Sequence, residues 1–367
     1  MGQSETTATI RRVLAHYDLP QTLMNYKQLV NGHINDTYQI ILADGNKERQ
    51  YILQRINDYV FKNPIQVMEN IKAITNYLES KEMHSNDCRI ITFINDKEGN
   101  NYTVCDSSVW RLCQYVENSI AYEHIENTKI LVSAGYAFGR FQTLLADMPI
   151  DQLTETIPGF HDTPARFNQL FAIAQEDPFG RVPKVSHELN FFLQHRTLAG
   201  RLANLLESGE LPLRVTHNDT KYNNILMHRK TNEPLCVIDL DTVMPGLSMY
   251  DYGDAIRFAA NEAMEDETDL NKVRLNMDYF EAFTRGFMEA AQSFLTPCEI
   301  EHMALGAVVI TIELASRFLA DYLNGDRYFR IHRPDHNLDR AKNQIRLAQD
   351  MIAHLPEMNQ IVKNQII

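Results

Sequence analysis

Apolar and polar positions alternate along the first part of the chain. From residue 26 to residue 56 the alternation has the period of two that predicts β-strands, with bends at 31–35 (NGHIN) and at 44–45. A short helix over 6–17 is expected before these three strands. After them the apolar spacing changes to three and four residues. This spacing predicts a helix over 63–80, with one apolar face formed by Val67, Ile71, Ile74 and Leu78.

The alternating pattern returns once and then gives way to helical spacing. Strand-like segments are expected at 89–94, 101–105 and 109–116, and the last runs into Glu117 and Asn118. Beyond this point, helical spacing recurs over 128–148, 187–208, 296–323 and 338–354. The pattern predicts an α+β fold with two lobes: a small, β-rich lobe over 1–117, including a hinge, and a larger, mainly helical lobe over 118–367.

Composition and charge restrict the classes of partner. The 367 residues carry a net charge of −13 and 44% hydrophobic residues. The chain is therefore expected to be globular and to bind neither nucleic acid nor a membrane, since both need a cationic face. The five cysteines are scattered without a CxxC pair, and the N-terminus lacks an apolar signal segment. These features predict a reducing, cytoplasmic setting without fixing an oligomeric state.

Two acid-bearing segments lie twenty residues apart in the second half of the chain. The first, THNDTKYNNIL, places His217, Asp219 and Asn224 in an HxDxxxxN pattern. The second, LCVIDLD, is an apolar run that ends in Asp239 and Asp241. Such a run predicts a short buried strand that presents carboxylates at its end.

This set of side chains is the one that phosphoryl transfer from a nucleotide needs. A carboxylate accepts the proton of the acceptor hydroxyl, and hard oxygen ligands hold the Mg²⁺ that bridges the phosphates of ATP. Asp219 is predicted to be the catalytic carboxylate, and Asn224 and Asp239 the metal ligands. HND stands where protein kinases have HRD, and DLD where they have DFG. The alternative is that these residues are loop polars on an acidic surface.

The chain resembles the aminoglycoside phosphotransferase and choline-kinase-like superfamily, and more closely the N-acetylhexosamine 1-kinases. The resemblance extends over nearly the whole chain. Besides the two segments above, it depends on NGHINDTY (31–38), YILQRIN (51–57), HDTPARF (161–167), DYGDAIRF (251–258) and SRFLADYLNGD (316–326). It implies a bilobal protein-kinase-like fold, with ATP as co-substrate and Mg²⁺ as cofactor.

The resemblance also suggests where the nucleotide binds. Gly32 and Asn35 lie in the first bend, which covers the phosphates in a kinase small lobe. Gln114 and Val116 lie at the end of the last strand, before the hinge whose backbone groups bind adenine. We treat these four residues as nucleotide-binding candidates.

The third strand departs from the kinase pattern. Gln54 stands where kinases carry a phosphate-binding lysine, and Arg55 follows it. Because neighbouring residues of a strand point to opposite faces, Arg55 replaces the lysine only if the register differs by one or its side chain wraps round. Otherwise Arg55 is solvated on the outer face. Glu69 on the next helix is either the glutamate that pairs with such a lysine or a solvated charge.

Further residues are assigned by the resemblance. Asp251 matches an aspartate that braces the catalytic loop, against His217. Arg317 and His33 match substrate-site residues of hexosamine kinases, and the segment 161–166 is placed near the substrate. The alternative for Arg317 is a structural ladder, because Glu313, Arg317 and Asp321 are spaced four residues apart on one helix.

The predicted function is transfer of the γ-phosphate of ATP to the anomeric hydroxyl of an N-acetylhexosamine, GlcNAc or GalNAc. One alternative keeps the fold and changes the acceptor to another sugar, an aminoglycoside, choline or homoserine. A second is a metal-dependent hydrolase, although no sulfatase-type nucleophile is present, since DTPAR (162–166) has Asp162 where Cys or Ser is required. A third is an inactive binding module, which the presence of all three acidic-site residues disfavours.

Overall fold

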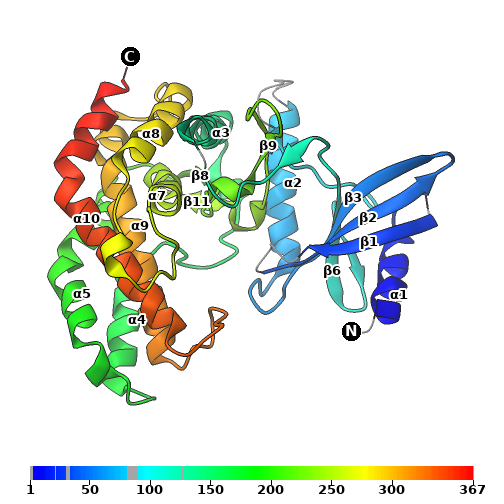
Figure 1. Ribbon diagram of the computed structural model, residues 1–367. Coiled ribbons are helices and arrows are strands. Elements are labelled where there is room, and N and C mark those ends of the chain that lie inside the picture. Colours follow the sequence, from blue (N-terminus) through cyan, green and yellow to red (C-terminus); the bar gives the residue numbers. More distant parts are fainter. Residues whose placement is uncertain (1–2, 21, 30–33, 81–88, 126, 367) are drawn as a thin grey trace.

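A β-sheet and a helical body form the two parts of the molecule (Figure 1). This computed structural model describes residues 3–20, 22–29, 34–80, 89–125 and 127–366. Helix α2 (Pro64–Ser80) lies between the sheet and the helical body. The mixed composition, with strands first and helices after, agrees with the predicted α+β class. The boundary after residue 117 stays a prediction.

The five-stranded sheet is antiparallel, in the order β1-β2-β3-β6-β5. Helix α1 (Gln3–Leu14) covers its outer face, where Ile10 packs with Ile40 and Leu53. Because side chains alternate along a strand, Gln54 points to the opposite face, toward α2. The strands are β1 (Thr22–Leu29), β2 (Asp36–Asp44), β3 (Lys47–Arg55), β5 (Thr103–Cys105) and β6 (Ser108–Gln114).

Two smaller sheets lie outside the five-stranded sheet. The predicted strand over 89–94 is wrong in extent: β4 covers only Arg89–Ile90 and pairs in parallel with β10 (Pro234–Val237). The order of this sheet is β4-β10-β9-β7, with β9 at Ile225–His228 and β7 at Ser119–Ile120. A separate antiparallel pair is formed by β8 (Arg214–Thr216) and β11 (Met244–Gly246).

Helix α9 (Pro297–Leu323) is the centre of the helical body and packs on α4, α7 and α10. A capping box is present at its start, between Thr296 and Glu299. By length and composition α9 could cross a membrane, but 89% of its most apolar window is buried against neighbouring elements. The other helices are α3 (Thr128–Leu145), α4 (Thr163–Glu176), α5 (Ser186–Ala199), α6 (Arg201–Glu207), α7 (Ser248–Ala259), α8 (Met277–Ala291) and α10 (His336–Asn364).

Two glycines let α7 approach α9 closely. A Cβ atom at Gly253 would lie 2.5 Å from the carbonyl of Gly306, and one at Gly306 would lie 2.2 Å from the carbonyl oxygen of Met249. Only residues without a side chain fit this crossing. The acidic residues of α7, Asp251 and Asp254, bond to the backbone of the loop over 217–220.

Candidate active site

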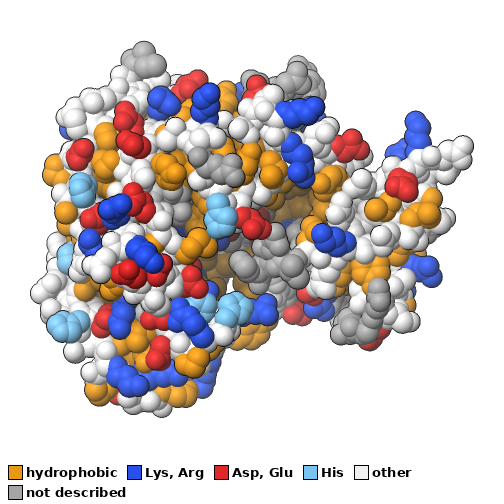
Figure 2. Space-filling view, viewed as in Figure 1, with side chains coloured by type: hydrophobic (Ala, Val, Ile, Leu, Met, Phe, Trp, Pro, Cys, Tyr) orange, Lys and Arg blue, Asp and Glu red, His pale blue; other side chains and the backbone are white. Residues whose placement is uncertain are grey.

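The two acid-bearing segments meet next to the five-stranded sheet, because Asp241 bonds to Arg111 of β6 and to Asn35. Figure 2 shows a hollowed surface between the helical body and this sheet. Strand β8 leads into the first segment, and the second leads into β11, the antiparallel neighbour of β8. The Thr242 hydroxyl donates to the carbonyl oxygen of His217 at 2.7 Å. The backbone nitrogen of Ile238 donates to the carbonyl oxygen of Asn224 at 2.9 Å. Sheet pairing and these hydrogen bonds therefore bring the two segments together, although they are separated in the sequence.

Asp219 is held in place from two sides. The side-chain nitrogen of Asn224 donates to the Asp219 carboxylate at 2.9 Å and to its carbonyl oxygen at 2.8 Å. The ammonium of Lys221 lies 2.7 Å from the other carboxylate oxygen. Desolvation opposes ionisation, but Lys221, with smaller contributions from His217 and Asn224, lowers the pKa of Asp219 below its usual value. Asp219 is therefore ionised at neutral pH and able to accept a hydrogen bond from a hydroxyl.

Asp239 follows β10 with a backbone φ of 61°, a left-handed conformation that is uncommon for residues with a side chain. The residue is exposed, and no described residue donates a hydrogen bond to its carboxylate. Desolvation by surrounding atoms and the charges of Asp241 and Asp219 raise its pKa to about 7. Water reaches this side chain, so repulsion from the two neighbouring carboxylates is the main physical cause of the raised pKa. Crowded like charges of this kind favour a bound cation.

The available oxygen atoms fit a Mg²⁺ ion that arrives with a nucleotide. Asn224 donates its amide nitrogen to Asp219, which leaves its amide oxygen for a cation. The Asp239 carboxylate is a second oxygen ligand of the kind Mg²⁺ prefers. Within the described ranges, no three His, Cys, Asp or Glu side chains form a metal site by themselves. A set of one amide and one carboxylate takes its remaining ligands from phosphates and water.

His217 connects the two segments through both of its ring nitrogens. It is fully buried, with its ring edge-on to Phe138 and Phe141 at 5.6 Å between centroids. Its Nε2 lies 2.9 Å from the carbonyl oxygen of Ile238, and its Nδ1 accepts from the backbone nitrogen of Asp219 at 3.3 Å. One nitrogen therefore donates and the other accepts.

The start of α7 supports the catalytic loop from below. The buried Asp251 carboxylate accepts hydrogen bonds from the backbone nitrogens of His217 at 2.8 Å and Asn218 at 2.7 Å. It also accepts from the side chain of Gln142 at 2.8 Å. Desolvation raises the pKa of Asp251, and these donors oppose that rise. Asp254 accepts a third loop bond, from the backbone nitrogen of Thr220 at 3.1 Å.

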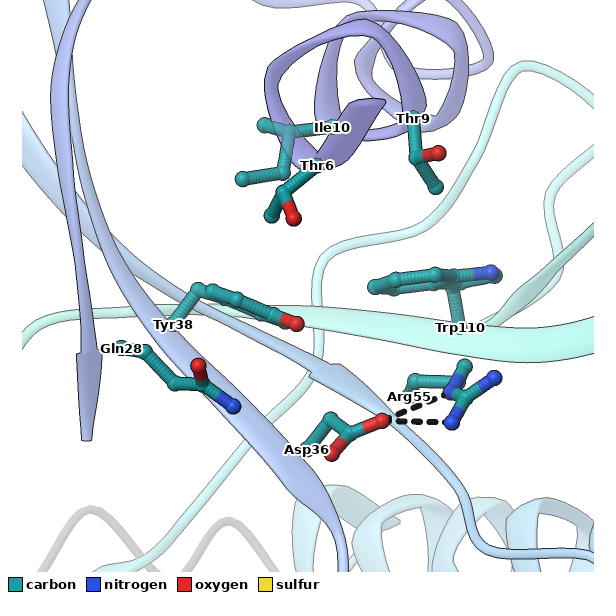
Figure 3. A pocket seen from close by; sticks show the side chains of 8 residues that line it. All are labelled: Thr6, Thr9, Ile10, Gln28, Asp36, Tyr38, Arg55 and Trp110. Atoms are coloured by element: carbon teal, nitrogen blue, oxygen red, sulfur yellow. Dashed lines mark hydrogen bonds and ion pairs between the residues drawn. The ribbon is translucent and has the colours of Figure 1, made fainter. Parts of the chain in front are cut away.

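Arg55 lies on the face of the sheet that α1 covers, so the structure does not support it as a nucleotide-binding residue. Its guanidinium pairs with Asp36, at 2.9 and 2.6 Å, in a cavity that Trp110 and α1 also line (Figure 3). Strand alternation puts Gln54 on the opposite face, where it donates to Thr37 at 3.1 Å. Glu69 on α2 is exposed, in agreement with the solvated alternative.

The other nucleotide candidates differ in their surroundings. Asn35 donates to the Asp241 carboxylate at 2.7 Å and so lies beside the acidic segments. The Gln114 side chain is exposed at the end of β6, and the carbonyl oxygen of Val116 accepts from the Ser119 hydroxyl at 2.6 Å. Gly32 and His33 lie outside the described residues, so their predicted roles stay predictions.

A second polar group, which we call the arginine cluster, consists of His161, Arg166, Glu313 and Arg317. Glu313 is buried and pairs with His161 at 2.8 Å and with the Thr163 hydroxyl at 2.6 Å. Arg166 donates to the carbonyl oxygen of Phe160 at 3.1 Å. Burial and the charge of Arg317 lower the pKa of Arg166. The two guanidinium groups both contact Phe160, Arg166 at its carbonyl oxygen and Arg317 over its ring, at 5.1 Å from the ring centroid.

The structure contradicts the ladder proposed as an alternative for Arg317. Glu313 bonds to other partners, and Asp321 accepts from the backbone nitrogens of residues 327–329, each at 2.9 Å. Arg317 forms no hydrogen bond or ion pair with another residue in the described part of the chain. Its guanidinium lies over three aromatic rings, at 5.1 Å from Phe160, 5.6 Å from Phe329 and 5.9 Å from Tyr328.

The arginine cluster adjoins the catalytic loop through α7. The ring of His161 lies 5.3 Å from the ring of Tyr250. Tyr250 directly precedes Asp251, which holds the catalytic loop. This ring contact links the 161–166 segment to the helix that supports the loop of Asp219, and the predicted place of the segment near the substrate stays a prediction.

Sequence reasoning missed two cations of the site. Lys221 was available from the sequence, because it follows Asp219 by two residues within the recognised motif. Arg111 on β6 carried no sequence signal, since it lies in an ordinary strand pattern. The structure brings it to Asp241, with which it forms a buried ion pair.

Comparison with known proteins identifies the fold. Residues 25–286 match the model of the phosphotransferase enzyme family. The structure is similar to a microcompartment-associated aminopropanol kinase, at 16% identity and a TM-score of 0.64, covering 96% of this chain and 98% of that one. It is also similar to an ethanolamine kinase of Plasmodium vivax (14% identity, 94% and 90% covered, TM-score 0.59). A choline kinase of Cryptosporidium parvum matches at 11% identity, 98% and 99% coverage and a TM-score of 0.58.

Proposed function

The chain belongs to the phosphotransferase enzyme family, and from this premise we propose that it phosphorylates the anomeric hydroxyl of an N-acetylhexosamine, GlcNAc or GalNAc. The products are ADP and the sugar 1-phosphate. Family membership makes the chain a kinase-like phosphotransferase rather than a hydrolase. The identity of the acceptor is the part that the arginine cluster supports.

Asp219 is the residue that binds the acceptor hydroxyl and accepts its proton. Its carboxylate is ionised and fixed by Asn224 and Lys221. A sugar hydroxyl has a far higher pKa than a carboxyl group, so Asp219 orients the hydroxyl first and takes its proton late in the reaction. Holding the two reactants in line is therefore worth more than basicity.

Bound Mg²⁺ would neutralise the charge of the transferred phosphoryl group, and Asn224 with Asp239 would hold it. His217, Asp251 and Asp254 hold these residues in position. They do so through backbone bonds and buried contacts, so their role is to position the loop rather than to touch the reacting atoms.

The observation that carries the acceptor assignment is the pair of arginines beside the catalytic loop. The only described acid in this cluster, Glu313, is already bound by His161 and Thr163. The structural neighbours are named for aminopropanol, ethanolamine and choline. Each of these acceptors carries a positively charged nitrogen, which two guanidinium groups would repel. A neutral sugar presents hydroxyl and acetamido oxygens that accept hydrogen bonds from guanidinium.

The cluster also contains polar atoms that lack a partner. The Nε2 of His161 and the Nε of Arg166 are buried without a hydrogen bond to any described residue. Leaving such atoms unpaired costs about 1–3 kcal/mol each. An oxygen-rich acceptor would satisfy them, and a compact alkyl amine would not.

Phosphorus NMR of the reaction products tests this proposal. The protein is incubated with ATP, Mg²⁺ and one acceptor from a panel of GlcNAc, GalNAc, glucose, galactose, choline, ethanolamine, homoserine and an aminoglycoside. We expect a sugar 1-phosphate resonance coupled to the anomeric proton with the acetamido sugars. Phosphorylation of only the amine-bearing acceptors, and of no acetamido sugar, would overturn the assignment. Release of inorganic phosphate without a phosphorylated acceptor would favour the hydrolase alternative.

A further inference from the structure

Strand β6 carries a buried guanidinium into the sheet face opposite α1. The Arg111 side chain is 1% exposed. In the strand register Arg111 is opposite Gln54, and its Nε donates to the Gln54 side-chain oxygen at 2.9 Å. The guanidinium also lies 4.8 Å from the ring centroid of Phe93. A buried cation in this environment needs an anionic partner.

That partner comes from the segment that carries the predicted metal ligand. Arg111 forms an ion pair with Asp241, whose side chain is 3% exposed. The other oxygen of Asp241 accepts from Asn35 at 2.7 Å. Both oxygens of Asp241 are therefore engaged by the five-stranded sheet and its first bend. This arrangement disfavours Asp241 as a metal ligand and makes it the link between the sheet and Asp239.

The pair places positive charge where the acids are most crowded. The acids of the site thus pair with two cations, Lys221 on Asp219 and Arg111 on Asp241. One cation comes from the helical body and the other from the sheet.

We propose that Arg111 supplies, from β6, the positive charge that β3 lacks at Gln54, and that through Asp241 it positions the segment carrying Asp239 against the nucleotide phosphates. Arg111 is a positioning residue in this scheme. Its position follows from the register, because residues opposite each other on neighbouring strands share a face of the sheet. The inference depends on the proposed nucleotide chemistry but not on the identity of the acceptor.

The test moves the cation from one strand to the other. Arg111→Gln removes the charge, and Gln54→Lys restores it on β3, at the directly bonded cross-strand position. Binding of ADP is measured by calorimetry with and without Mg²⁺, in the absence of any acceptor, together with the melting temperature. Arg111→Gln should weaken binding of ADP with Mg²⁺ about tenfold or more, the scale of a lost charge-assisted contact. The double variant should recover most of that loss.

The melting temperature and the ADP affinity distinguish a role of Arg111 in nucleotide binding from a role in stability alone. If the double variant regains its melting temperature but not ADP affinity, or if Arg111→Gln binds ADP like wild type, the inference is overturned. Should Arg111→Gln not fold, the ADP affinities of Arg111→Lys and of the double variant are compared with that of wild type instead, because each variant keeps one cation on this face of the sheet. Arg55→Gln is the matched control and should leave ADP binding unchanged, since Arg55 faces α1.

The acceptor-free design separates this inference from the assignment of the sugar. An incorrect acceptor leaves the ADP measurement unaffected. A wild-type protein that binds no ADP in the presence of Mg²⁺ would overturn the proposed function and, with it, the role of Arg111.

Discussion

The ammonium of Lys221 lies 2.7 Å from the carboxylate of Asp219, two residues earlier in the same loop. Lys221 is the main group that lowers the pKa of Asp219 against the effect of desolvation. The loop therefore contains both the proposed proton acceptor and the cation that keeps it ionised. This short-range pairing makes the pH dependence of the reaction a property of one loop.

Lys221→Met should move the acid limb of the pH profile of kcat/KM to higher pH. Without the ammonium, desolvation raises the pKa of Asp219, so the carboxylate is protonated and lost at a less acidic pH. The measurement is kcat/KM for the acceptor from pH 4 to pH 8. Lys272→Met, which removes an exposed lysine paired with Glu267, should leave the profile where it is. An unshifted acid limb in Lys221→Met would show that Lys221 does not control Asp219.

Asp219→Asn should abolish turnover and leave ATP binding nearly intact. The substitution removes the carboxylate that faces the acceptor and keeps both proposed metal ligands. Steady-state kinetics and calorimetry with a nucleotide provide the two measurements. Activity within about tenfold of wild type, or roughly 1.4 kcal/mol of barrier, would remove Asp219 from the mechanism.

Asp239→Asn should weaken binding of the metal–nucleotide complex. An amide oxygen is a poorer ligand than a carboxylate, so excess Mg²⁺ or Mn²⁺ should partly restore the rate. The metal concentration for half-maximal activity is compared between variant and wild type. Identical metal dependence would exclude Asp239 as a ligand. Asp241 would then become the candidate metal ligand, despite its bonds to Arg111 and Asn35.

Arg317→Ala should raise the sugar KM or lower kcat while the melting temperature falls little. Arg317 has only ring contacts among the described residues, so its loss removes no ion pair from the helix. A desolvated charged hydrogen bond to substrate is worth about 1.5–3 kcal/mol. Arg317→Lys should not restore activity, since an ammonium lacks the planar fork of guanidinium.

The control for this pair of variants is Arg327→Ala, which removes another arginine that lies over a ring, at 5.7 Å from Phe179. It should leave the sugar kinetics unchanged. Wild-type sugar kinetics in both Arg317 variants would exclude Arg317 from the acceptor site. The assignment would then depend on His33 and the 161–166 segment.

Gly306→Ala should destabilise the protein and reduce activity through the catalytic loop. The new methyl group would meet the carbonyl oxygen of Met249 at 2.2 Å, so α7 must move away from α9. Overpacking of this kind typically costs about 1–3 kcal/mol. Chemical denaturation measures the change. At Gly200 an added Cβ meets nothing closer than 3.5 Å, and Gly200→Ala should therefore be nearly neutral; equal losses in both variants would contradict the helix-crossing explanation.

Local patterns determined much of the architecture. The period-two stretch before residue 56 is β1, β2 and β3, and the predicted helix over 296–323 is α9, which begins with a capping box between Thr296 and Glu299. Local signals failed where packing decides the ends of elements. The segment over 187–208 is two helices that meet at Gly200, and α10 continues to Asn364, past the predicted end at 354.

The candidate catalytic residues were readable from the sequence because their spacing lies within single segments. Asp219 and Asn224 are five residues apart, and the loop that contains them closes on itself through a side-chain bond. Such short-range geometry is set by local backbone conformation. The chain itself therefore carried the prediction of a carboxylate and an amide that act together.

Only the tertiary structure decided which cations serve the acids from a distance. Arg111 and Asp241 are 130 residues apart, and strand register alone places Arg111 on the face of Gln54 and Arg55 on the face of α1. In the same way, Glu313 bonds to His161, in the turn before α4, instead of to Arg317 on its own helix. Pairing across the fold depends on how sheets and helices pack, and a one-residue change of register would reverse it.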